Sequence, residues 1–267
     1  MNLVQAALNE WSPWLLGAAI VAIVEVYSVG LMLLCRMRWG ESLLSLNNEV
    51  AGFKFAVVGV LYAVLLAFVV VAVWENYHDT ETAVRNEATT IVDLHALAYV
   101  LPESGGSSIR RHLQAYVKQV RDSEWPAMAE GRASPAAARD LDHLTRALFD
   151  SRPEALRDLA LYQNALRLLT VLNDNRNARL DSSDGTVPTV LWLVMMAGGL
   201  IMLGYPSFFG SSNVVAQSLM TAALAALVGL TLFLGIVLDY PFTGQVQISA
   251  AEMDHALSQM PPEWPPR

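Results

Sequence analysis

The chain has 267 residues, of which 54% are apolar and only 16% are charged. Its mean hydropathy of +0.37 is too high for an ordinary soluble domain. The net charge of −8, without any run of basic side chains, excludes a nucleic-acid-binding protein, because phosphate contacts need clustered Lys and Arg. The single cysteine, Cys35, lies in an apolar run, which predicts a packed thiol rather than a disulfide or a zinc ligand.

The charged side chains are concentrated in the middle of the chain. Residues 75–187 contain 13 basic and 17 acidic side chains, whereas the other 154 residues contain only 12 charges. This distribution predicts a water-soluble centre between two lipid-embedded flanks. We therefore divide the chain into an N-terminal membrane pair (1–74), a soluble α-helical domain (75–187), a C-terminal membrane pair (188–238) and a C-terminal tail (239–267).

Four apolar runs are long enough to cross a bilayer, which takes about 20 residues of helix. They cover residues 14–34, 53–73, 188–209 and 214–238. The first run follows Ser12, a suitable N-cap, and Pro13, which suits the first position of a helix. It does not resemble a cleaved secretory signal, because Glu10 precedes it and two arginines follow it. We therefore expect an uncleaved membrane helix.

The centre shows helical periodicity and no strand-like alternation. No Gly or Pro occurs between Trp74 and Leu101, so one helix is expected to continue from the second run into the central domain. Further helix starts are expected at Ser107, Ser134-Pro135 and Arg152-Pro153, and loops at Glu103–Gly106 and Glu130–Pro135. The predicted fold class is an all-α integral membrane protein with four transmembrane helices and a soluble helical domain inserted between helices 2 and 3.

The positive-inside rule does not decide the orientation of this arrangement. Three basic residues lie in the loop between the first two spans, and three flank the central domain: Arg36, Arg38 and Lys54, against Arg85, Arg176 and Arg179. The first group favours a cytoplasmic loop and the second favours a cytoplasmic central domain. We predict the first orientation, with the loop from Arg36 to Lys54 in the cytoplasm and the central domain on the other side of the membrane.

Glu25 lies in the middle of the first span, where inserting a charge costs about 2.5–3.5 kcal/mol or more. Its carboxyl group should therefore face protein or water rather than lipid. One interpretation makes it an ion-path or proton-relay group. The other makes it a protonated carboxyl that is hydrogen-bonded to a neighbouring helix, with Tyr27, Ser28 or Tyr62 as partners.

No motif in the sequence supports an enzyme. The five histidines never occur as His-Glu-x-x-His or His-x-x-x-His, and there is no phosphate loop, dinucleotide-binding turn or nucleophile elbow. One group beside the second span either concentrates cations or forms a solvated helix face: Glu75, His78, Asp79, Glu81 and Glu87. The absence of an Asp-x-Asp-x-Asp-Gly loop favours the solvated face. We expect no catalytic residue, no metal site and no cofactor.

Two features of the spans could serve conduction or packing. Leu61, Leu65, Phe68 and Ala72 fall on one stripe of the second span, which could form an apolar constriction that gates by dewetting or could simply pack on neighbouring helices. After the fourth span, Asp239 precedes a proline turn and can cap backbone donors there. Tyr240 and Phe242 are expected to anchor this segment at the bilayer interface.

Two segments carry a more specific pattern. The first runs from Tyr62 to Phe68 and on through Trp74-Glu75-Asn76-Tyr77 to Glu87-Ala88, and the second is Leu238-Asp239-Tyr240-Pro241-Phe242-Thr243-Gly244. Together with Arg176, Pro188 and Trp192, they resemble the bestrophin-like membrane family, a bacterial group with two helical spans on each side of a soluble helical domain. The resemblance extends from about residue 51 to residue 249.

This resemblance implies a distant relation to bestrophins, which are pentameric anion channels. Their second transmembrane helix lines the pore, and their soluble helices form a vestibule. Two bestrophin features, a calcium clasp and an aromatic ladder at the neck, have no evident counterpart in this sequence.

The expected function is therefore that of a homo-oligomeric ion channel of a bacterial inner membrane, with anions as the ions that the resemblance implies. Its partners would be the lipid bilayer, other copies of the chain and small inorganic ions. The alternative is a non-conducting scaffold or signalling protein whose soluble domain binds a partner. A proton-coupled transporter built on Glu25 is a third class, but the paired broken helices of many transporters are missing.

Overall fold

The computed structural model describes residues 3–151 and 156–261, and these residues form helices and turns without any strand. The chain divides into two compact units. We call the described parts of residues 1–10, 76–185 and 240–267 the polar unit, and residues 11–75 and 186–239 the apolar unit. One helix, α4 (Asn48–Leu97), contributes to both units without a break, as the absence of Gly and Pro after Trp74 predicts.

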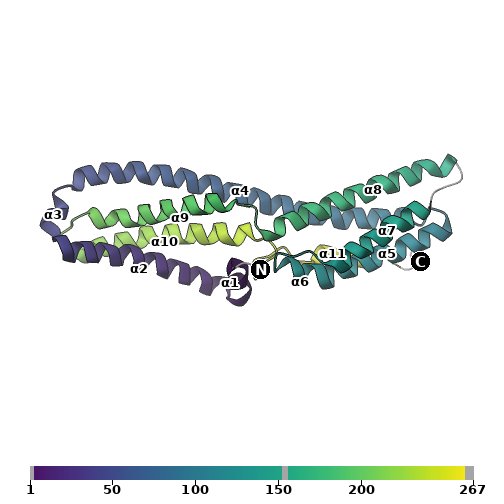
Figure 1. Ribbon diagram of the computed structural model, residues 1–267, viewed down its shortest axis with the longest axis horizontal. Helices are drawn as coiled ribbons and strands as arrows, with labels where there is room; N and C mark the ends of the chain where they lie inside the picture. Colours follow the sequence, from purple (N-terminus) through teal and green to yellow (C-terminus); the bar gives the residue numbers. More distant parts are fainter. Residues whose placement is uncertain (1–2, 152–155, 262–267) are drawn as a thin grey trace. The chain divides into compact units, whose positions relative to one another are not determined.

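The apolar unit consists of long apolar helices that lie side by side (Figure 1). Its elements are α2 (Pro13–Trp39), α3 (Glu41–Ser45), the first half of α4, α9 (Thr189–Gly204), the 3-10 turn η3 (Tyr205–Phe208) and α10 (Val214–Asp239). Within the described residues, four helical segments are long and apolar enough to cross a membrane. Helix α2 begins as predicted, because Pro13 is its first residue and the Ser12 hydroxyl accepts a hydrogen bond from the Leu15 amide at 3.4 Å.

Glycines let the helices of the apolar unit approach one another closely. A Cβ atom on Gly229 of α10 would lie 2.8 Å from a methyl group of Val24 on α2. A Cβ atom on Gly198 of α9 would lie 2.9 Å from the ring of Tyr62 on α4. Small residues at such contacts are the usual means by which apolar helices pack in a membrane, where the hydrophobic effect contributes little between them.

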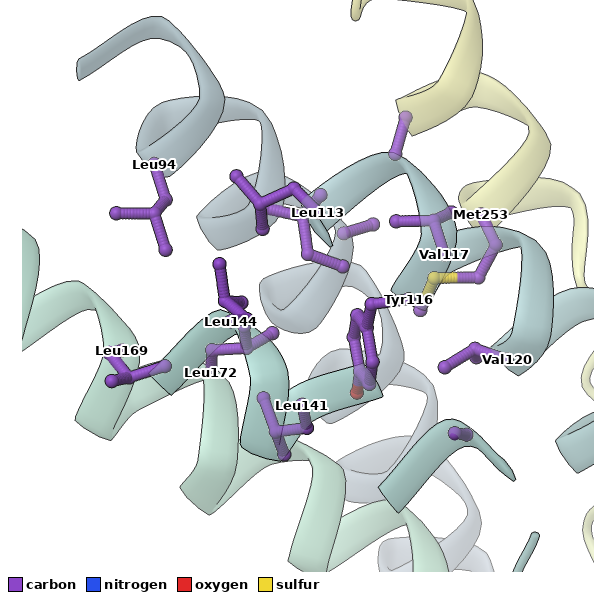
Figure 2. Close-up of a cluster of buried hydrophobic side chains, with 14 of the residues drawn as sticks. Leu94, Leu113, Tyr116, Val117, Val120, Leu141, Leu144, Leu169, Leu172 and Met253 are labelled. Atoms are coloured by element: carbon purple, nitrogen blue, oxygen red, sulfur yellow. The ribbon is translucent and has the colours of Figure 1, made fainter. Parts of the chain in front are cut away.

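The polar unit is a helical bundle with its own hydrophobic core. Its elements are α1 (Leu3–Glu10), the second half of α4, α5 (Glu103–Gln119), the π-helical turn η1 (Val120–Glu124), α6 (Trp125–Met128), α7 (Pro135–Asp150), α8 (Leu156–Asp181), the 3-10 turn η2 (Ser182–Asp184) and α11 (Ala251–Ser258). Figure 2 shows the core where α4, α5, α7 and α8 converge. The side chains of Leu94, Leu113, Leu144 and Leu172 are fully buried there.

The expected helix starts in the polar unit have mixed outcomes. Helix α7 begins after Ser134, whose hydroxyl accepts a hydrogen bond from the Ala137 amide at 3.4 Å, as predicted. The loop predicted at Glu103–Gly106 is wrong, because α5 already begins at Glu103. A Cβ atom on Gly106 would collide with the carbonyl oxygen of Ala98, so this glycine permits a close approach rather than a turn. The predicted start at Arg152-Pro153 lies outside the described residues.

The segment after α10 folds onto the polar unit up to Pro261, the last residue described. Five of its side chains are part of the hydrophobic core: Phe242, Ile248, Met253, Ala256 and Met260. The sequence analysis did not predict helix α11. Gly244 has a φ angle of +77°, and a Cβ atom at this position would lie 2.7 Å from the carbonyl oxygen of Leu8 in α1. This motif glycine is therefore required both by backbone conformation and by contact with α1.

Candidate functional site

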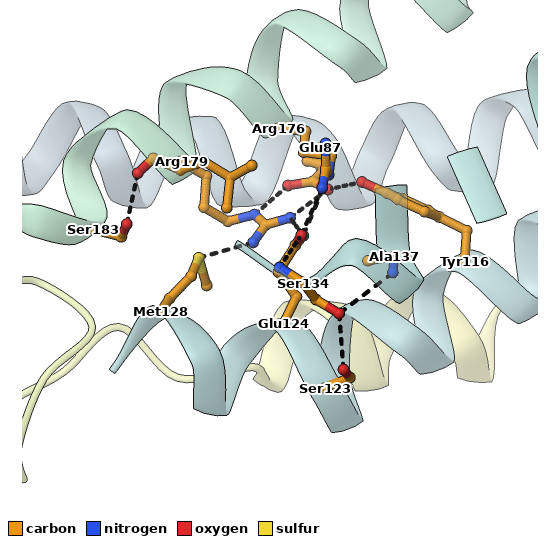
Figure 3. Close-up of polar contacts among 11 residues, drawn as sticks. Glu87, Tyr116, Ser123, Glu124, Met128, Ser134, Ala137, Arg176, Arg179 and Ser183 are labelled. Atoms are coloured by element: carbon orange, nitrogen blue, oxygen red, sulfur yellow. Dashed lines mark hydrogen bonds and ion pairs between the residues drawn. The ribbon is translucent and has the colours of Figure 1, made fainter. Parts of the chain in front are cut away.

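A buried charge cluster holds the polar unit together. We use this name for Glu87 on α4, Tyr116 on α5, Glu124 on η1, and Arg176 and Arg179 on α8 (Figure 3). The side chains of Glu87, Glu124 and Arg179 are fully buried. Such a cluster needs charge balance and many hydrogen bonds, because uncompensated buried charges are strongly destabilising. Two carboxylates face two guanidinium groups, so the cluster is electrically neutral as a whole.

Arg179 bridges the two carboxylates. Its Nε and Nη2 atoms donate to the two carboxylate oxygens of Glu87 at 2.6 and 3.0 Å. Its Nη2 atom also donates to Oε2 of Glu124 at 2.8 Å, and its Nη1 atom lies 3.0 Å from the sulfur of Met128. A bidentate guanidinium–carboxylate pair of this kind fixes geometry as well as charge.

The remaining members complete the hydrogen bonding of the two carboxylates. Arg176 donates from Nη2 to Oε1 of Glu124 at 2.6 Å. The Tyr116 hydroxyl donates to Oε1 of Glu87 at 2.6 Å. The backbone amide of Ser134 donates to Oε1 of Glu124 at 3.3 Å. The cluster therefore joins α4, α5, η1, the start of α7 and α8.

A local irregularity in the chain places Glu124 in the cluster. Residues Val120–Glu124 form a π-helical turn before α6. Pro126 lies two residues after this turn and has no N–H group to donate to it, which favours such a break in the α-helical pattern. Glu124 is the last residue of this wider turn, and its side chain contacts Arg176 and Arg179.

The charges of the cluster reinforce one another. Burial alone would raise the pKa of Glu124, but the positive charges of Arg179 and Arg176 outweigh burial and hold that pKa below its ordinary value of 4.5. Burial and the neighbouring Glu87 carboxylate raise the pKa of Tyr116 well above 10. At neutral pH the tyrosine is therefore a neutral donor. With every group paired and buried, the cluster is suited to fixing helices rather than to binding a ligand or transferring a proton.

The sequence analysis singled out Glu87 through the acidic group beside the second span and the family resemblance, and Arg176 through the resemblance. It named Arg179 only in the count of basic residues around the central domain, and it assigned no role to Glu124 or Tyr116. One signal was available, because Arg176 and Arg179 are three residues apart and share a helix face. Two like charges so placed need an acidic partner. The acidic group proposed beside the second span also divides, since Glu87 is buried in the cluster whereas Glu75, His78 and Asp79 are exposed.

The second feature of interest is the outer stripe of α4 in the apolar unit. Of the four predicted pore-lining residues, Leu61, Phe68 and Ala72 are exposed in the single chain and Leu65 is partly buried. Leu61 is 67% exposed and Phe68 is 71% exposed. The inward stripe, about 100° round the helix, is buried instead and consists of Tyr62, Leu66, Val69 and Val73. The predicted stripe is thus largely exposed in the single chain.

Glu25 on α2 is partly buried, and no residue in the described ranges forms a hydrogen bond or ion pair with it. The hydrogen-bond partners suggested for Glu25 from the sequence bond to other groups or to none. The hydroxyl of Tyr27 donates to the carbonyl oxygen of Leu200 at 3.1 Å, and that of Ser28 donates to Leu203 at 2.6 Å. The hydroxyl of Tyr62 is buried without a partner. The suggested hydrogen bonds to Glu25 are therefore absent from the single chain.

Asp239 closes a polar clasp at the start of α9. Its Oδ1 atom accepts hydrogen bonds from the backbone amides of Thr186 and Val187 at 2.9 and 3.0 Å. Its Oδ2 atom accepts a hydrogen bond from Nε1 of Trp192 at 3.1 Å. Pro188, another motif residue, directly precedes α9. These motif residues of the apolar unit thus fix the end of α10 to the beginning of α9.

The other motif residues occupy contrasting environments. Trp74 and Glu75 are exposed on α4. Pro241 is buried, and its carbonyl oxygen accepts a hydrogen bond from the Ile248 amide at 2.8 Å. The expectation that Phe242 anchors at the bilayer interface is wrong. Its ring is fully buried in the polar unit and packs edge-on against Trp125 with 5.6 Å between ring centroids, because the chain turns back into that core after Pro241.

Solved structures share this fold. Three crystal structures of a bacterial bestrophin homologue from Klebsiella pneumoniae, two of them single-residue variants, match with TM-scores of 0.65, 0.68 and 0.64. Their sequence identities to this chain are 14%, 13% and 15%. The matches cover 90–91% of this chain and 96–97% of those chains. A comparison with curated proteins gives no match.

The sequence itself matches a family model. The model of the Bestrophin-like domain covers residues 21–253, which include every residue of the charge cluster and of the Asp239 clasp. This range also contains the outer stripe of α4. The chain therefore belongs to the Bestrophin-like family.

Proposed function

We propose that this protein is an ion channel that assembles from several copies of the chain, with the outer stripe of α4 lining a shared axis. The exposure of Leu61, Phe68 and Ala72 is the observation that carries this proposal. Large apolar side chains on a membrane helix contact either lipid, another copy of the chain or a water-filled path. Family membership favours the path, because α4 corresponds to the second transmembrane helix that lines the pore in bestrophins.

In this proposal the four apolar segments cross a bacterial inner membrane, and the polar unit, formed mainly by residues 75–187, is a soluble domain inserted between the second and third spans. The outer stripe would form an apolar ring at the axis. Wetting such a ring is unfavourable, so it would act as the gate. Five copies and anion conduction are what the resemblance to bestrophins suggests for this assembly.

The proposal also concerns Glu25, whose carboxyl group has no partner among the described residues. A carboxyl group without a partner in the single chain acquires one on assembly or contacts water. In a channel it would contact the ion path or a neighbouring copy. Glu25→Gln should preserve conductance and its pH dependence if the group only packs, and should alter the pH dependence if the group lies on the path.

The competing function is a non-conducting scaffold in which the same stripe joins copies together. The replacement Phe68→Ser separates the two functions, measured as chloride and potassium currents in planar bilayers. In a channel, a small polar residue at the constriction should raise conductance severalfold, because it lowers the barrier to wetting. In a scaffold, the same replacement would weaken assembly without producing current.

A matched control is available on α2. Ile23 is 68% exposed, close to the value for Phe68, but it lies outside the outer stripe of α4. Ile23→Ser should therefore leave conductance unchanged. If neither the wild type nor Phe68→Ser carries current while both form oligomers, the channel proposal fails and the scaffold replaces it.

A further inference from the structure

Lys54 is a cation without a partner at one end of the apolar unit. It lies in the second turn of α4 and is exposed, and no ion pair or hydrogen bond links it to any residue in the described parts of the chain. By contrast, Arg36 at the same end of the unit is held by Glu41 at 3.1 Å. Glu49, the nearest acidic residue along α4, is about 140° away round the helix. The charge of Lys54 is therefore available to a ligand.

Lys54 lines a pocket whose other walls are aromatic, apolar and amide groups. The pocket has a volume of about 360 Å³ and is lined by Asn47, Val50, Ala51, Lys54, Tyr205 and Phe208. The Tyr205 hydroxyl forms no hydrogen bond with any described residue. A cation, a phenol hydroxyl and an amide thus meet beside apolar surface, and the lining contains no carboxylate.

The surrounding residues place this pocket at the level of lipid headgroups. It lies where α4 begins at Asn48 and η3 ends at Phe208. Tyr205 packs against Phe55 and Phe208, with ring centroids 5.6 and 5.9 Å apart. Aromatic rings gather at both surfaces of a bilayer, and lysines at helix ends extend toward the phosphates there.

We infer that this pocket binds one anionic phospholipid of the surrounding bilayer. Lys54 contacts the phosphate, the Tyr205 hydroxyl donates a hydrogen bond to a phosphate oxygen, and the first part of an acyl chain lies along Val50 and Phe208. An anionic lipid fits better than a choline lipid, because Lys54 repels a choline ammonium and no carboxylate in the lining offsets that repulsion. This site is independent of whether the protein conducts ions.

Native mass spectrometry of the full chain in a mild non-ionic detergent tests the site. Phosphatidylglycerol and phosphatidylcholine are added together, and the retained adducts are counted. The wild type should retain phosphatidylglycerol in preference to phosphatidylcholine. Lys54→Gln should lower retention of phosphatidylglycerol about fivefold, which is the effect of one lysine near an anionic surface. Tyr205→Phe, which keeps the ring, should lower it by about two- to threefold.

Arg38 provides the matched control, because it is also exposed, forms no ion pair with any described residue and does not line the pocket. Arg38→Gln should leave retention unchanged. Lys54→Arg should retain the lipid, which separates loss of the charge from loss of the fold. Equal retention of both lipids by the wild type overturns the inference. So does an equal loss for Lys54→Gln and Arg38→Gln, or a change in oligomer size in place of lipid loss.

Discussion

The two units of the chain differ in how their side chains are paired and covered within the single chain. The polar unit buries charged groups together with a continuous hydrophobic core, and each member of its charge cluster has a partner within the same chain. The apolar unit contains few charges, yet leaves large side chains such as Phe68, Leu193 and Leu227 exposed. The charge cluster of the polar unit is thus complete within a single chain, whereas the exposed apolar side chains of the apolar unit are suited to contact lipid or, in the proposed assembly, other copies. This difference predicts where a mutation acts on folding and where it acts on assembly.

Removing the central cation of the polar unit tests its completeness most severely. Arg179→Met should destabilise this unit by about 3–5 kcal/mol, because it leaves the fully buried Glu87 carboxylate without its cation. Hydrogen exchange of the amides in the second half of α4 would report the loss as reduced protection. The matched control is Arg85→Met on α4, which breaks only an exposed pair with Glu81 at 3.7 Å and should cost about 0–1 kcal/mol. Equal losses for the two variants would show that the cluster does not hold the unit together.

Local sequence signals predicted those elements of both units that are determined by interactions between neighbouring residues. The apolar runs are sufficient to indicate four membrane-spanning helices, since length and hydropathy decide such helices. The starts of α2 and α7 follow from Ser12-Pro13 and Ser134-Pro135, because an N-cap acts only over the next three residues. The unbroken course of α4 follows from the absence of Gly and Pro.

Long-range pairing could not be predicted in the same way. Arg179 and Glu87 are 92 positions apart, and no periodicity connects them. Phe242 follows an apolar helix, so its burial in the polar unit depends on where the chain turns after Pro241. Gly105 and Gly106 indicated a loop by composition, whereas their role is a close approach to Ser151 and Ala98. In each case the deciding contact lies beyond the few neighbouring residues over which local sequence signals act.

Packing within the apolar unit can be tested by a substitution with a smaller expected effect on stability. Gly198→Ala should destabilise the protein by about 1–2 kcal/mol, because the added methyl group meets the Tyr62 ring at 2.9 Å and the better helix propensity of alanine offsets only part of the overlap. The change is read from the thermal unfolding midpoint in detergent.

Two further variants identify the cause of that change. Gly30→Ala is the matched control, since a Cβ atom there would meet nothing within 4 Å, and it should stabilise by up to about 1 kcal/mol. Adding Tyr62→Leu to Gly198→Ala should recover part of the stability by making room for the methyl group. If it does not, α4 and α9 are not packed through this contact.

The last prediction concerns the pH dependence of stability and rests on His95, a buried histidine of the polar unit outside the charge cluster. Its Nε2 atom has no hydrogen-bond partner in the described structure, and burial, together with the nearby Arg110 charge, lowers its pKa from 6.5 to about 4. The unfolded chain therefore binds a proton on this residue at a higher pH than the folded chain does. Stability should be unaffected above pH 6.5 and should fall as the pH decreases from 6.5 towards 4.

The contribution of His95 can be isolated between pH 4.5 and 6.5. The lowered pKa of Glu124 makes its stabilising effect decline only below 4.5, the ordinary value for glutamate. Within this window His95→Leu should flatten the pH dependence of stability by less than about 1.4 kcal/mol per pH unit, which is the slope for one whole proton. Should His95→Leu follow the wild-type profile, the folded chain protonates His95 as readily as the unfolded chain does, and the polar unit is more open to water around this residue than its buried position implies.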